Sequence, residues 1–407
     1  MKKAAVIGAG ASGLMAAYAA AKNGNQVTVF EKNEKAGKKI YITGKGRCNV
    51  TNDTSAEGFL ENVVRNAKFL KGCAYAFPPE KTMRFLEEGG LPLKVERGNR
   101  VFPASDKASD VTKCLERYCR NEGVEFHFQE CVLRLEKQGE DFLLVTEKGE
   151  YLFDCVIVCT GGLSYPATGS TGDGYTFARR FGLKIKPLRP ALCGIVCDMK
   201  EISRLQGLTL KNVQITACRQ GKILGSFFGE MLFTHFGVSG PIVLSLSSLL
   251  NETQNWKEIS LSIDLKPALD EATLDKRLLR DFEKFKNKQM QNALDELLPK
   301  SLILPVLQQA EIPPQLAVNS LSKEARNRLI KVLKGFRLYP VSLRPVEEGI
   351  VTAGGVDVAQ IHPKTMQCKE IPGLYFCGEV LDVDAFTGGF NLQIAFMTGY
   401  AAGSSIR

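Results

Sequence analysis

Three glycines and one acid near the start of the chain have the spacing of a phosphate-binding turn. Gly8, Gly10 and Gly13 form a G-x-G-x-x-G pattern between an apolar segment, residues 3–7, and an Ala-rich segment. In such a turn the first glycine permits the tight bend, the second lets backbone approach a pyrophosphate, and the third lets helix and strand pack closely. Glu31 ends the next apolar segment, near the separation of roughly 20 residues at which an acid meets a ribose hydroxyl. The pattern predicts a nucleotide site.

The helix expected after this turn gives a second reason to expect an anion. Ala11, Ser12 and Gly13 stand in its first turn, where N–H groups lack partners within the helix and the dipole is positive. A phosphate bound there is held by these N–H groups. The alternative is an ordinary strand-to-helix turn, but strand, turn, helix and acid follow in the order that favours nucleotide binding.

Two later stretches offer bare backbone to a ligand in a similar way. An apolar strand expected at residues 155–159 runs into the Thr-Gly-Gly sequence of residues 160–162. Glu379 and Asp382 follow a second short strand, and a Gly-Gly turn at 388–389 leads into a helix expected from about Asn391. A helix that begins after such a turn is a second anion site. A cofactor with a phosphate at one end and a reducible ring at the other suits both sites.

Residues 32–52 combine cations with turn-forming residues. The hydrophobic period is broken there, which favours a loop over a helix or strand. The cations of this segment include Lys35, Lys38, Lys39, Lys45 and Arg47. Contact with phosphates or an electron-rich ring and a solvated basic loop are both consistent with this composition.

Composition excludes several classes of protein. Of the 407 residues, 44% are apolar and 24% charged, as in globular proteins, and no run of 18 apolar residues occurs. The chain enters a strand at once, so we expect no secretory leader and a cytoplasmic location. Twelve cysteines without a C-x-x-C pair, and only three histidines, predict buried thiols rather than disulfides or structural zinc. The net charge of +9 suits an anionic partner but does not require one.

The alternation of strands and helices changes character near residues 187–190. We predict a nucleotide-binding domain in two parts, 1–189 and 345–407, around an inserted domain at 190–344. The insert is expected to be β-rich at 190–265 and 336–344 and helical at 266–335. The helical part carries 13 Lys and Arg against nine Asp and Glu, which favours a solvated helix face over a partner site.

Two helical regions are also expected within the first part. Residues 59–90 have a helical pattern that Gly89 and Gly90 end. An amphipathic helix is predicted from Ser109, as N-cap, to about Gly123. Its apolar face includes Val111 and Leu115.

The chain as a whole resembles a known family of flavoproteins. The resemblance rests on the glycine turn and on residues 37–52 (GKKIYITGKGRCNVTN), 98–108 (GNRVFPASDKA), 229–241 (GEMLFTHFGVSGP) and 378–393 (GEVLDVDAFTGGFNLQ). By these motifs the chain is similar to the family that includes BaiN-type bile-acid reductases, bacterial aminoacetone oxidases and the ribosomal RNA dihydrouridine synthase RdsA. The resemblance implies a Rossmann-like, α/β, two-dinucleotide-binding-domain flavoprotein that binds FAD, with the insert as a lid of β-barrel and helical parts over the substrate.

The resemblance also implies which residues bind the cofactor. Glu31 is expected at the adenosine ribose, Val132 at the adenine and Asp382 at a ribityl hydroxyl, while residues 389–391 direct N–H groups at the flavin N1 and O2 edge. The expected set is Gly8, Gly10, Ala11, Ser12, Gly13, Glu31, Lys32, Lys38, Lys39, Thr43, Gly46, Arg47, Cys48, Asn49, Val132, Thr160, Gly161, Gly162, Gly378, Glu379, Asp382, Gly388, Gly389, Phe390 and Asn391.

The expected activity is that of an FAD-dependent oxidoreductase which passes hydride from NAD(P)H to a polarised C=C bond. The acceptor is a steroid or bile-acid enone, or a uracil of 23S ribosomal RNA that becomes dihydrouridine. An amine oxidase of the aminoacetone type that uses oxygen, and a non-enzymatic flavin-bearing RNA-binding or assembly protein, are the alternatives. No second G-x-G-x-x-G occurs in a strand and helix context, so NAD(P)H is expected to bind transiently.

Two residues are candidates for the proton that such a reduction needs. Cys48 follows Arg47 in the loop that the resemblance places along the flavin, and nearby cations are expected to lower its pKa from about 8.5 towards neutrality. A small, partly buried thiol that fills space is the alternative. His235 lies in a glycine-punctuated motif of the insert. It is either a proton donor or a structural histidine that is satisfied by hydrogen bonds to backbone.

Overall fold

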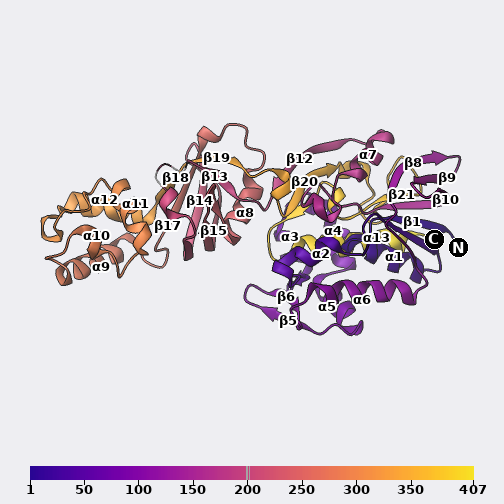
Figure 1. The fold of residues 1–407 in the computed structure, drawn as a ribbon, viewed down its shortest axis with the longest axis horizontal. Coiled ribbons are helices and arrows are strands. Elements are labelled where there is room, and N and C mark those ends of the chain that lie inside the picture. Colours follow the sequence, from indigo (N-terminus) through magenta and orange to yellow (C-terminus); the bar gives the residue numbers. More distant parts are fainter. Residues whose placement is uncertain (199, 201) are drawn as a thin grey trace. The chain divides into compact units, whose positions relative to one another are not determined.

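The computed structural model describes residues 1–198, 200 and 202–407 (Figure 1). These residues form two compact units, one built from Met1–Ala191 and Pro345–Arg407 and the other from Leu192–Arg344. Each unit has its own hydrophobic core. The roles expected for these segments, FAD binding and a lid over the substrate, stay predictions.

A parallel sheet of five strands forms the centre of the first unit, in the order β21-β11-β1-β2-β7. Its strands are β1 (Lys3–Ile7), β2 (Gln26–Glu31), β7 (Glu125–Phe128), β11 (Cys155–Val158) and β21 (Leu374–Phe376). Every neighbouring pair runs parallel, so the carboxyl ends of all five strands share one edge. The loops that follow β1, β11 and β21 therefore meet at that edge. The strand-turn-helix order of the first 31 residues and the α/β class are confirmed.

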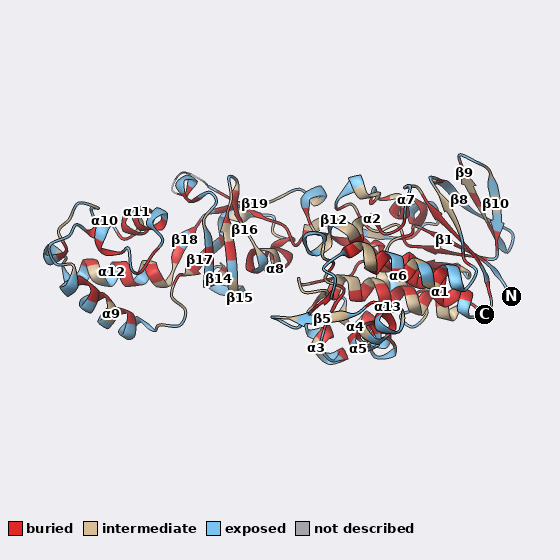
Figure 2. Cartoon of the chain, turned by 60° about the horizontal axis from the view of Figure 1, so that its bottom comes forward, coloured by how far each residue is buried: buried red, intermediate tan, exposed pale blue. Residues whose placement is uncertain are grey.

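Helix α1 (Ala11–Lys22) joins β1 to β2, and α6 (Ala108–Asn121) and α13 (Phe390–Ser405) pack on it (Figure 1). Every residue of α1 except Lys22 is buried, because the sheet and both helices cover it. Its many alanines keep these contacts close. In Figure 2, β1 is drawn red because most of its residues are buried. The helices of the second unit, such as α9 (Glu271–Lys284), have pale blue faces, which mark exposed residues.

Smaller sheets and helices complete the first unit. The antiparallel sheet β8–β10 packs on β2 through contacts of Phe30 with Tyr151 and Phe153. The remaining elements are α2 (Lys38–Ile42), β3 (Thr51–Asn52), α3 (Ala56–Glu61), β4 (Val63–Arg65), α4 (Ala67–Ala76), α5 (Pro79–Glu88), β5 (Leu93–Glu96), β6 (Arg100–Pro103), β8 (Val132–Gln138), β9 (Asp141–Thr146), β10 (Glu150–Phe153), α7 (Asp173–Arg180), β12 (Ile185–Ala191), β20 (Val351–Val356) and β22 (Asp384–Ala385).

Three local expectations for this unit were wrong in detail. The region 59–90 is not one helix, because Pro78 and Pro79 separate α4 from α5 and a short strand separates α3 from α4. The basic region 32–52 is not wholly loop, since α2 lies within it. Helix α6 begins one residue before Ser109, with Lys107 at the N-cap and no side-chain cap bond. Its predicted apolar face, including Val111 and Leu115, is buried.

The second unit contains an antiparallel sheet of seven strands in the order β18-β17-β14-β15-β16-β13-β19. Its strands are β13 (Ile195–Cys197), β14 (Thr209–Arg219), β15 (Lys222–Phe233), β16 (Gly237–Ser239), β17 (Ile259–Asp264), β18 (Phe336–Leu338) and β19 (Pro340–Leu343). The end strands β18 and β19 are separated in sequence by Tyr339 alone, but no ladder joins them within the described residues. The expected closed barrel therefore stays a prediction.

The helices of this unit are α8 (Pro241–Leu250), α9, α10 (Met290–Ala293), α11 (Lys300–Gln309) and α12 (Lys323–Lys334). The last four lie in the segment expected to be helical. Helix α8 lies within residues 190–265, the segment expected to be β-rich, together with β13 to β17. Pro241 at its first position suits a helix start, and Ile242, Leu246 and Leu249 cover the glycines of β15.

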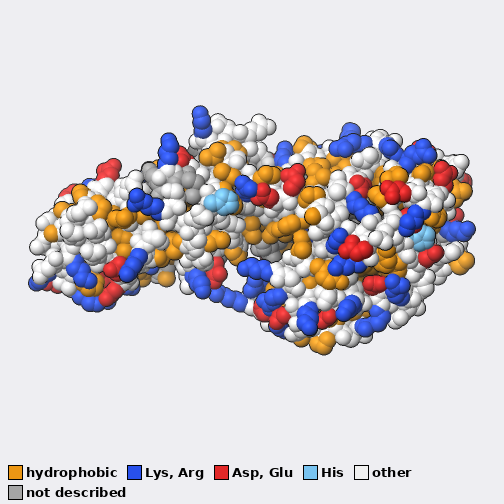
Figure 3. Space-filling model, viewed as in Figure 1, with side chains coloured by type: hydrophobic (Ala, Val, Ile, Leu, Met, Phe, Trp, Pro, Cys, Tyr) orange, Lys and Arg blue, Asp and Glu red, His pale blue; other side chains and the backbone are white. Residues whose placement is uncertain are grey.

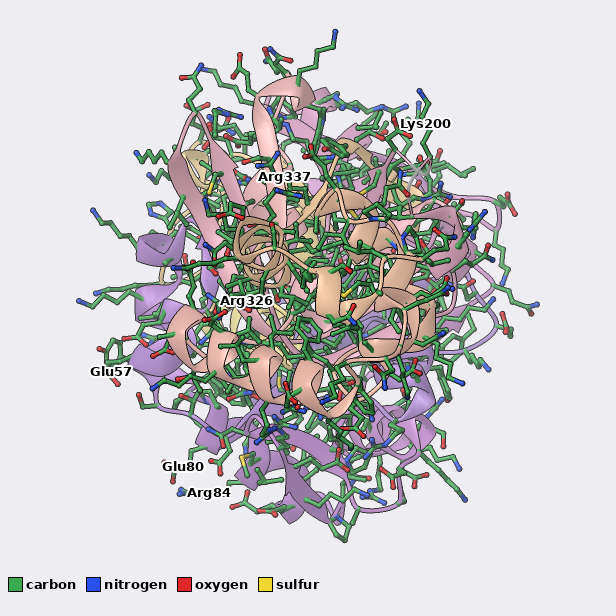
Figure 4. All side chains as sticks on the ribbon, turned by 90° about the vertical axis from the view of Figure 1, so that its left-hand side faces the viewer. Glu57, Glu80, Arg84, Lys200, Arg326 and Arg337 are labelled. Carbon is green, nitrogen blue, oxygen red and sulfur yellow. The ribbon has the colours of Figure 1, made fainter. Side chains whose placement is uncertain are left out.

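Charges in this part of the chain are largely mixed. Figure 3 shows Lys and Arg interspersed with Asp and Glu on the face it presents. Arg326 of α12 pairs with Asp275 of α9 at 2.7 Å, and Lys284 pairs with Glu296. Figure 4 shows a comparable exposed pair in the first unit, where Glu80 and Arg84 of α5 project away from the ribbon together. Pairing of this kind is typical of a solvated helix face.

All twelve cysteines are free thiols, and ten of them are buried, as the sequence predicted. Within the described residues, no helix combines the length and the hydropathy that crossing a membrane requires.

Candidate cofactor site

A large cavity opens at the carboxyl edge of the parallel sheet, entirely within the first unit. It holds about 1250 Å³ of atom-free space, including the part that is open to solvent. Many of the residues predicted to bind the cofactor line it: Gly8, Gly10, Ala11, Ser12, Glu31, Lys32, Lys38, Lys39, Thr43, Val132, Thr160, Gly161, Glu379 and Asn391. Residues that are up to 383 positions apart in the chain therefore face one space.

The three glycines of the turn have three different environments. A Cβ at Gly13 would stand 1.9 Å from the carbonyl oxygen of Gly8, so helix and turn pack without space for a side chain. Gly8 has φ +102°, and a Cβ there would stand 2.7 Å from the Cys159 carbonyl oxygen. A Cβ at Gly10 would meet nothing within 4 Å, because Gly10 faces the cavity. Gly10 is thus the glycine beside which a ligand has room to approach the backbone.

Two helix N-termini reach this cavity. Ala11 and Ser12 belong to the first turn of α1, and Asn391 and Leu392 to the first turn of α13; all four line it. Unpaired N–H groups and the helix dipole favour an anion or a developing negative charge at such ends.

The separation of these two N-termini follows from how the helices pack. Gly399 of α13 lies against Ser12, and Gly403 lies against Ala16, four residues further along both helices. The helices therefore run in the same direction, with Thr398 roughly level with the start of α1. Since α13 begins eight residues earlier, at Phe390, its N-terminus lies about 12 Å beyond that of α1 along the helix axis.

Glu31 connects the second strand to the glycine turn. Its Oε2 accepts a 2.8 Å hydrogen bond from the backbone N–H of Ala9, and its Oε1 accepts from both the backbone and the side chain of Asn33. The carboxylate lies at the cavity wall and is only 8% exposed. Its orientation is therefore set before any ligand arrives.

Lys39 and Glu379 form a partly buried ion pair at the cavity wall. The Lys39 Nζ is 2.8 Å from Glu379 Oε2 and 2.7 Å from Ser164 Oγ. Glu379 Oε1 also accepts from Ser164 Oγ and from the Thr352 backbone N–H. The network joins the segments that follow β2, β11 and β21 with β20, so it holds these parts of the wall together.

Two buried polar atoms that make no hydrogen bond to a described residue mark positions suited to a ligand, although Arg65 Nε lies 3.9 Å from one of them, Asp382 Oδ1. Thr160 Oγ1 and Asp382 Oδ1 are buried and make no hydrogen bond within the described residues. Asp382 Oδ2 accepts from Asn66 Nδ2, while burial raises the pKa of Asp382 against the opposing effect of Arg65. Val383, the residue after Asp382, lines the cavity. Hydroxyl groups of a ribityl chain and phosphate oxygens are chemically suited to these positions.

Asn391 holds the start of α13 to the preceding loop. Its Nδ2 donates to the Ala385 carbonyl at 2.8 Å, and its Oδ1 accepts from the Ala385 N–H. The side chain is therefore turned back on the loop, which leaves the backbone of the first helical turn to meet a ligand.

Other predicted cofactor residues do not line this cavity: Gly13, Gly46, Arg47, Cys48, Asn49, Gly162, Gly378, Asp382, Gly388, Gly389 and Phe390. Arg47 lies over the Phe102 ring and pairs with Glu96 and Asp106, at 2.7 Å in the latter case. Gly389, at φ +97°, precedes α13, and a Cβ there would stand 2.3 Å from the Thr51 carbonyl oxygen. Several of these residues thus shape the wall without forming its surface.

The lowered pKa expected for Cys48 is wrong. Its side chain is fully buried, and burial raises the pKa of the thiol to about 12. Arg47, the cation expected to lower it, is directed instead to Glu96 and Asp106. Cys48 also has φ +59°, an unusual left-handed conformation for a residue other than glycine. The thiol therefore lacks the property for which it was proposed as proton donor.

His235 belongs to the second unit and is exposed to solvent. Its ring meets Phe236 edge-on, with the centroids 5.1 Å apart. Both alternatives for His235, a proton donor and a structural histidine satisfied by backbone, stay predictions.

Sequence reasoning missed part of the cavity wall. The unpredicted lining residues include Asn33, Glu130, Cys131, Asp173, Ile350, Val351, Leu392 and Ala395. Asn33 lies in the basic segment 32–52, so the composition of that segment was a usable signal. Ile350 and Val351 are ordinary apolar residues by type, and no local signal marks them.

Comparison with known proteins agrees with this architecture. The family model described as HI0933-like protein Rossmann domain matches residues 2–405. The chain is 30% identical over 406 residues to the 3-dehydro-bile acid delta(4,6)-reductase of Clostridium scindens, covering 99% of this chain and 98% of that protein. It is 32% identical over 408 residues to the ribosomal RNA dihydrouridine synthase of Haemophilus influenzae, covering 98% and 97%.

Solved structures share the fold at lower identity. The 3-ketosteroid-delta4-(5alpha)-dehydrogenase of Rhodococcus jostii aligns with TM-score 0.53 at 15% identity, covering 99% of this chain and 96% of that one. An open flavocytochrome c3 fumarate reductase aligns with TM-score 0.52 at 17% identity, covering 99% and 77%. The fold is that of a Rossmann-domain flavoprotein. Within that class, the chain belongs to the HI0933-like family, and the family resemblance seen in the sequence is confirmed.

Proposed function

We propose that this protein is a cytoplasmic FAD-dependent oxidoreductase that takes hydride from NAD(P)H and reduces a C=C bond conjugated with a carbonyl group. The observation that carries the proposal is the meeting of two offset helix N-termini at one cavity, beside the open face of Gly10. A dinucleotide with a pyrophosphate at one position and an electron-accepting ring at another suits this arrangement. Its relatives include a bile-acid reductase and ribosomal RNA dihydrouridine synthases.

FAD, when bound, supplies a carrier that accepts two electrons from one substrate and delivers them to another. The chain's own residues would bind and orient it. The first-turn N–H groups of α1 hold the pyrophosphate, Gly10 admits it, and Glu31 accepts from the adenosine ribose. Val132 meets the adenine through backbone, and Asp382 Oδ1 accepts from a ribityl hydroxyl.

The first-turn N–H groups of α13, beginning where Asn391 lines the cavity, are directed at the reducible end. A helix dipole there stabilises negative charge by about 0.3–1 kcal/mol, or more where it is partly buried. The Lys39–Glu379 pair keeps the wall between the two ends in place.

Enones of steroids or bile acids and the uracil ring share the acceptor chemistry, a C=C bond next to a carbonyl. The proposal therefore covers both a small-molecule substrate and a uracil of ribosomal RNA. A flavin amine oxidase and a non-enzymatic RNA-binding flavoprotein remain the alternatives that the experiment must distinguish.

The test has two stages. The cofactor released from purified protein is first identified by chromatography, and FAD is expected. The protein is then reduced anaerobically with NADH or NADPH and mixed separately with a steroid enone, a 23S ribosomal RNA fragment, and oxygen. Rapid reoxidation by one of the C=C acceptors, with slow reoxidation by oxygen, is expected.

Other results would contradict the proposal in identifiable ways. Recovery of FMN, or a colourless protein that FAD does not reconstitute, removes the cofactor assignment. Reduction by aminoacetone followed by fast reaction with oxygen indicates the amine oxidase. Mass spectrometry of ribosomal RNA nucleosides from a strain lacking the gene then separates the two acceptors, since only the RNA substrate predicts loss of a dihydrouridine.

A further inference from the structure

Two thiols that the proposed reaction does not use lie against each other beneath the glycine turn. Cys159 follows β11 and Cys377 follows β21, and their Sγ atoms are 3.2 Å apart. Val158 pairs with Phe376 in the parallel ladder, so the two cysteines continue the same register. Neighbouring strands lie about 4.7–4.9 Å apart. That separation falls within the Cα distance of about 4.4–6.8 Å that a disulfide accepts.

The two thiols differ in access. Cys159 lines the cavity and is 4% exposed, whereas Cys377 has no exposed surface. Burial and the neighbouring Cys159 raise the pKa of the Cys377 thiol well above its usual range. Because the thiolate is the reactive form, Cys377 is a poor first nucleophile. A small oxidant that enters the cavity therefore meets Cys159 first, and Cys377 lies in position to react with the product.

We propose that Cys159 and Cys377 form a dithiol that hydrogen peroxide oxidises to a disulfide when the cavity holds no cofactor. The Cys159 sulfur, as thiolate, attacks one peroxide oxygen; the O–O bond breaks, and the leaving hydroxide takes the proton that the thiol released. This step gives a sulfenic acid and water. The Cys377 sulfur then attacks the Cys159 sulfur, the S–O bond breaks, and hydroxide leaves as water with the Cys377 proton. Two thiols and one peroxide yield one disulfide and two waters, so two electrons pass from sulfur to oxygen.

The dithiol adjoins the phosphate-binding turn on both sides. A Cβ at Gly8 would stand 2.7 Å from the Cys159 carbonyl oxygen, and a Cβ at Gly378, next to Cys377, would stand 2.5 Å from Ser12 Oγ. At both positions the neighbouring segments are too close to admit even a methyl group. Closing the sulfurs from 3.2 Å to about 2.05 Å therefore displaces the supports of the turn and of the α1 N-terminus. The disulfide weakens FAD binding, and bound FAD shields Cys159. This coupling rests on the proposed function, whereas formation of the disulfide does not.

The experiment compares full-length protein freed of cofactor with the same protein holding FAD. Both are treated with hydrogen peroxide, free thiols are blocked, and peptides are mapped without reduction. We expect a Cys159–Cys377 linkage in the cofactor-free protein and about tenfold slower formation with FAD at ten times its Kd. The oxidised protein is expected to bind FAD about tenfold more weakly, and dithiothreitol to restore binding.

Single variants define the order of the steps. Cys377→Ser stops the reaction at a sulfenic acid on Cys159, which a cyclic diketone traps, whereas Cys159→Ser abolishes both products. Cys119→Ser is the matched control, because this buried thiol donates to the Leu14 carbonyl oxygen, at 3.1 Å, and its loss should leave the linkage intact. If the serine variants fold poorly, peptide mapping of the wild-type protein decides the question alone.

Several outcomes overturn the proposal. Peroxide treatment that leaves both thiols free, or that links either one to a different cysteine, removes the dithiol. A Cys159–Cys377 disulfide that leaves the Kd for FAD unchanged removes its effect on the cofactor. Failure of the reduced protein to bind FAD contradicts the proposed function instead, and the linkage in cofactor-free protein still tests the dithiol.

Discussion

Gly399 of α13 lies so close to Ser12 of α1 that a methyl group on Gly399 would stand 2.3 Å from the Ser12 carbonyl oxygen. Such an approach is possible only where the Cβ is absent. The two helices are therefore held in one axial register, and that register sets the offset of about 12 Å between their N-termini. Gly399, which is not itself among the residues lining the cavity, thus sets the relative position of the two helix N-termini that reach it.

Gly10 and Gly13 are expected to respond differently to the same added methyl group. Gly13→Ala places a Cβ 1.9 Å from a backbone oxygen, so the cofactor-free protein should lose about 1–3 kcal/mol of unfolding free energy or more. Gly10→Ala meets no atom within 4 Å and should change that free energy by less than about 0.5 kcal/mol, while FAD binding weakens. Denaturant unfolding and FAD titration measure the two effects. Equal destabilisation by both substitutions would show that Gly10 does not face open space.

The Lys39–Glu379 pair is expected to stabilise the fold more than its neighbour Lys38–Glu34. Lys39→Met leaves a half-buried carboxylate with fewer donors, and about 1–3 kcal/mol of unfolding free energy should be lost. Lys38→Met breaks a more exposed pair, which solvent screens, and should lower the unfolding free energy less than Lys39→Met does. Adding Glu379→Gln to Lys39→Met should recover part of the loss in a double-mutant cycle. Purely additive effects would mean that the pair is not coupled.

Cys48→Ala is expected to leave chemistry unchanged and to affect stability. A buried thiol with a pKa of about 12 is a poor proton donor near neutral pH, so reoxidation of reduced protein by a C=C acceptor should keep the wild-type rate. Loss of the buried sulfur should lower the unfolding free energy by about 1 kcal/mol. Stopped-flow absorbance and denaturant unfolding check the two statements. A drop of about 10²-fold or more in the reoxidation rate, with FAD binding intact, would restore Cys48 as the acid.

Asp382 is expected to give the cofactor-free protein a specific pH dependence. Burial raises its pKa in the folded state, whereas the unfolded side chain titrates near the ordinary value of about 3.9. Between the two values the folded state binds more protons, so this group's contribution to stability falls as pH rises through that window. Asp382→Asn should remove this pH dependence. The measurement is the unfolding free energy of wild type minus that of the variant, determined across the pH range. A difference that does not vary with pH would mean that the carboxyl titrates normally.

Local spacing was enough to predict the backbone of the glycine-turn half of the candidate cofactor site. The order of residues 3–31 sets a strand, a turn, a helix and a second strand, because each step depends on backbone dihedrals and on periods of two or 3.6 residues. The distinct environments of Gly8, Gly10 and Gly13, and the position of Glu31 beside Ala9, follow from that spacing. The start of α13 after Gly389 was predictable for the same reason.

Tertiary structure alone decided which distant groups meet and which are buried. Lys39 contacts Glu379 across 340 positions, and Cys159 contacts Cys377 across 218, with no periodic signal linking either pair. Arg47 was read as a cation beside Cys48, yet Glu96 and Asp106 hold it, and the thiol is sealed from solvent. Sequence determines local geometry and the types of groups available. The charged neighbours of a side chain and its desolvation depend on how separate segments pack. These two factors set the pKa of the side chain and therefore its chemistry.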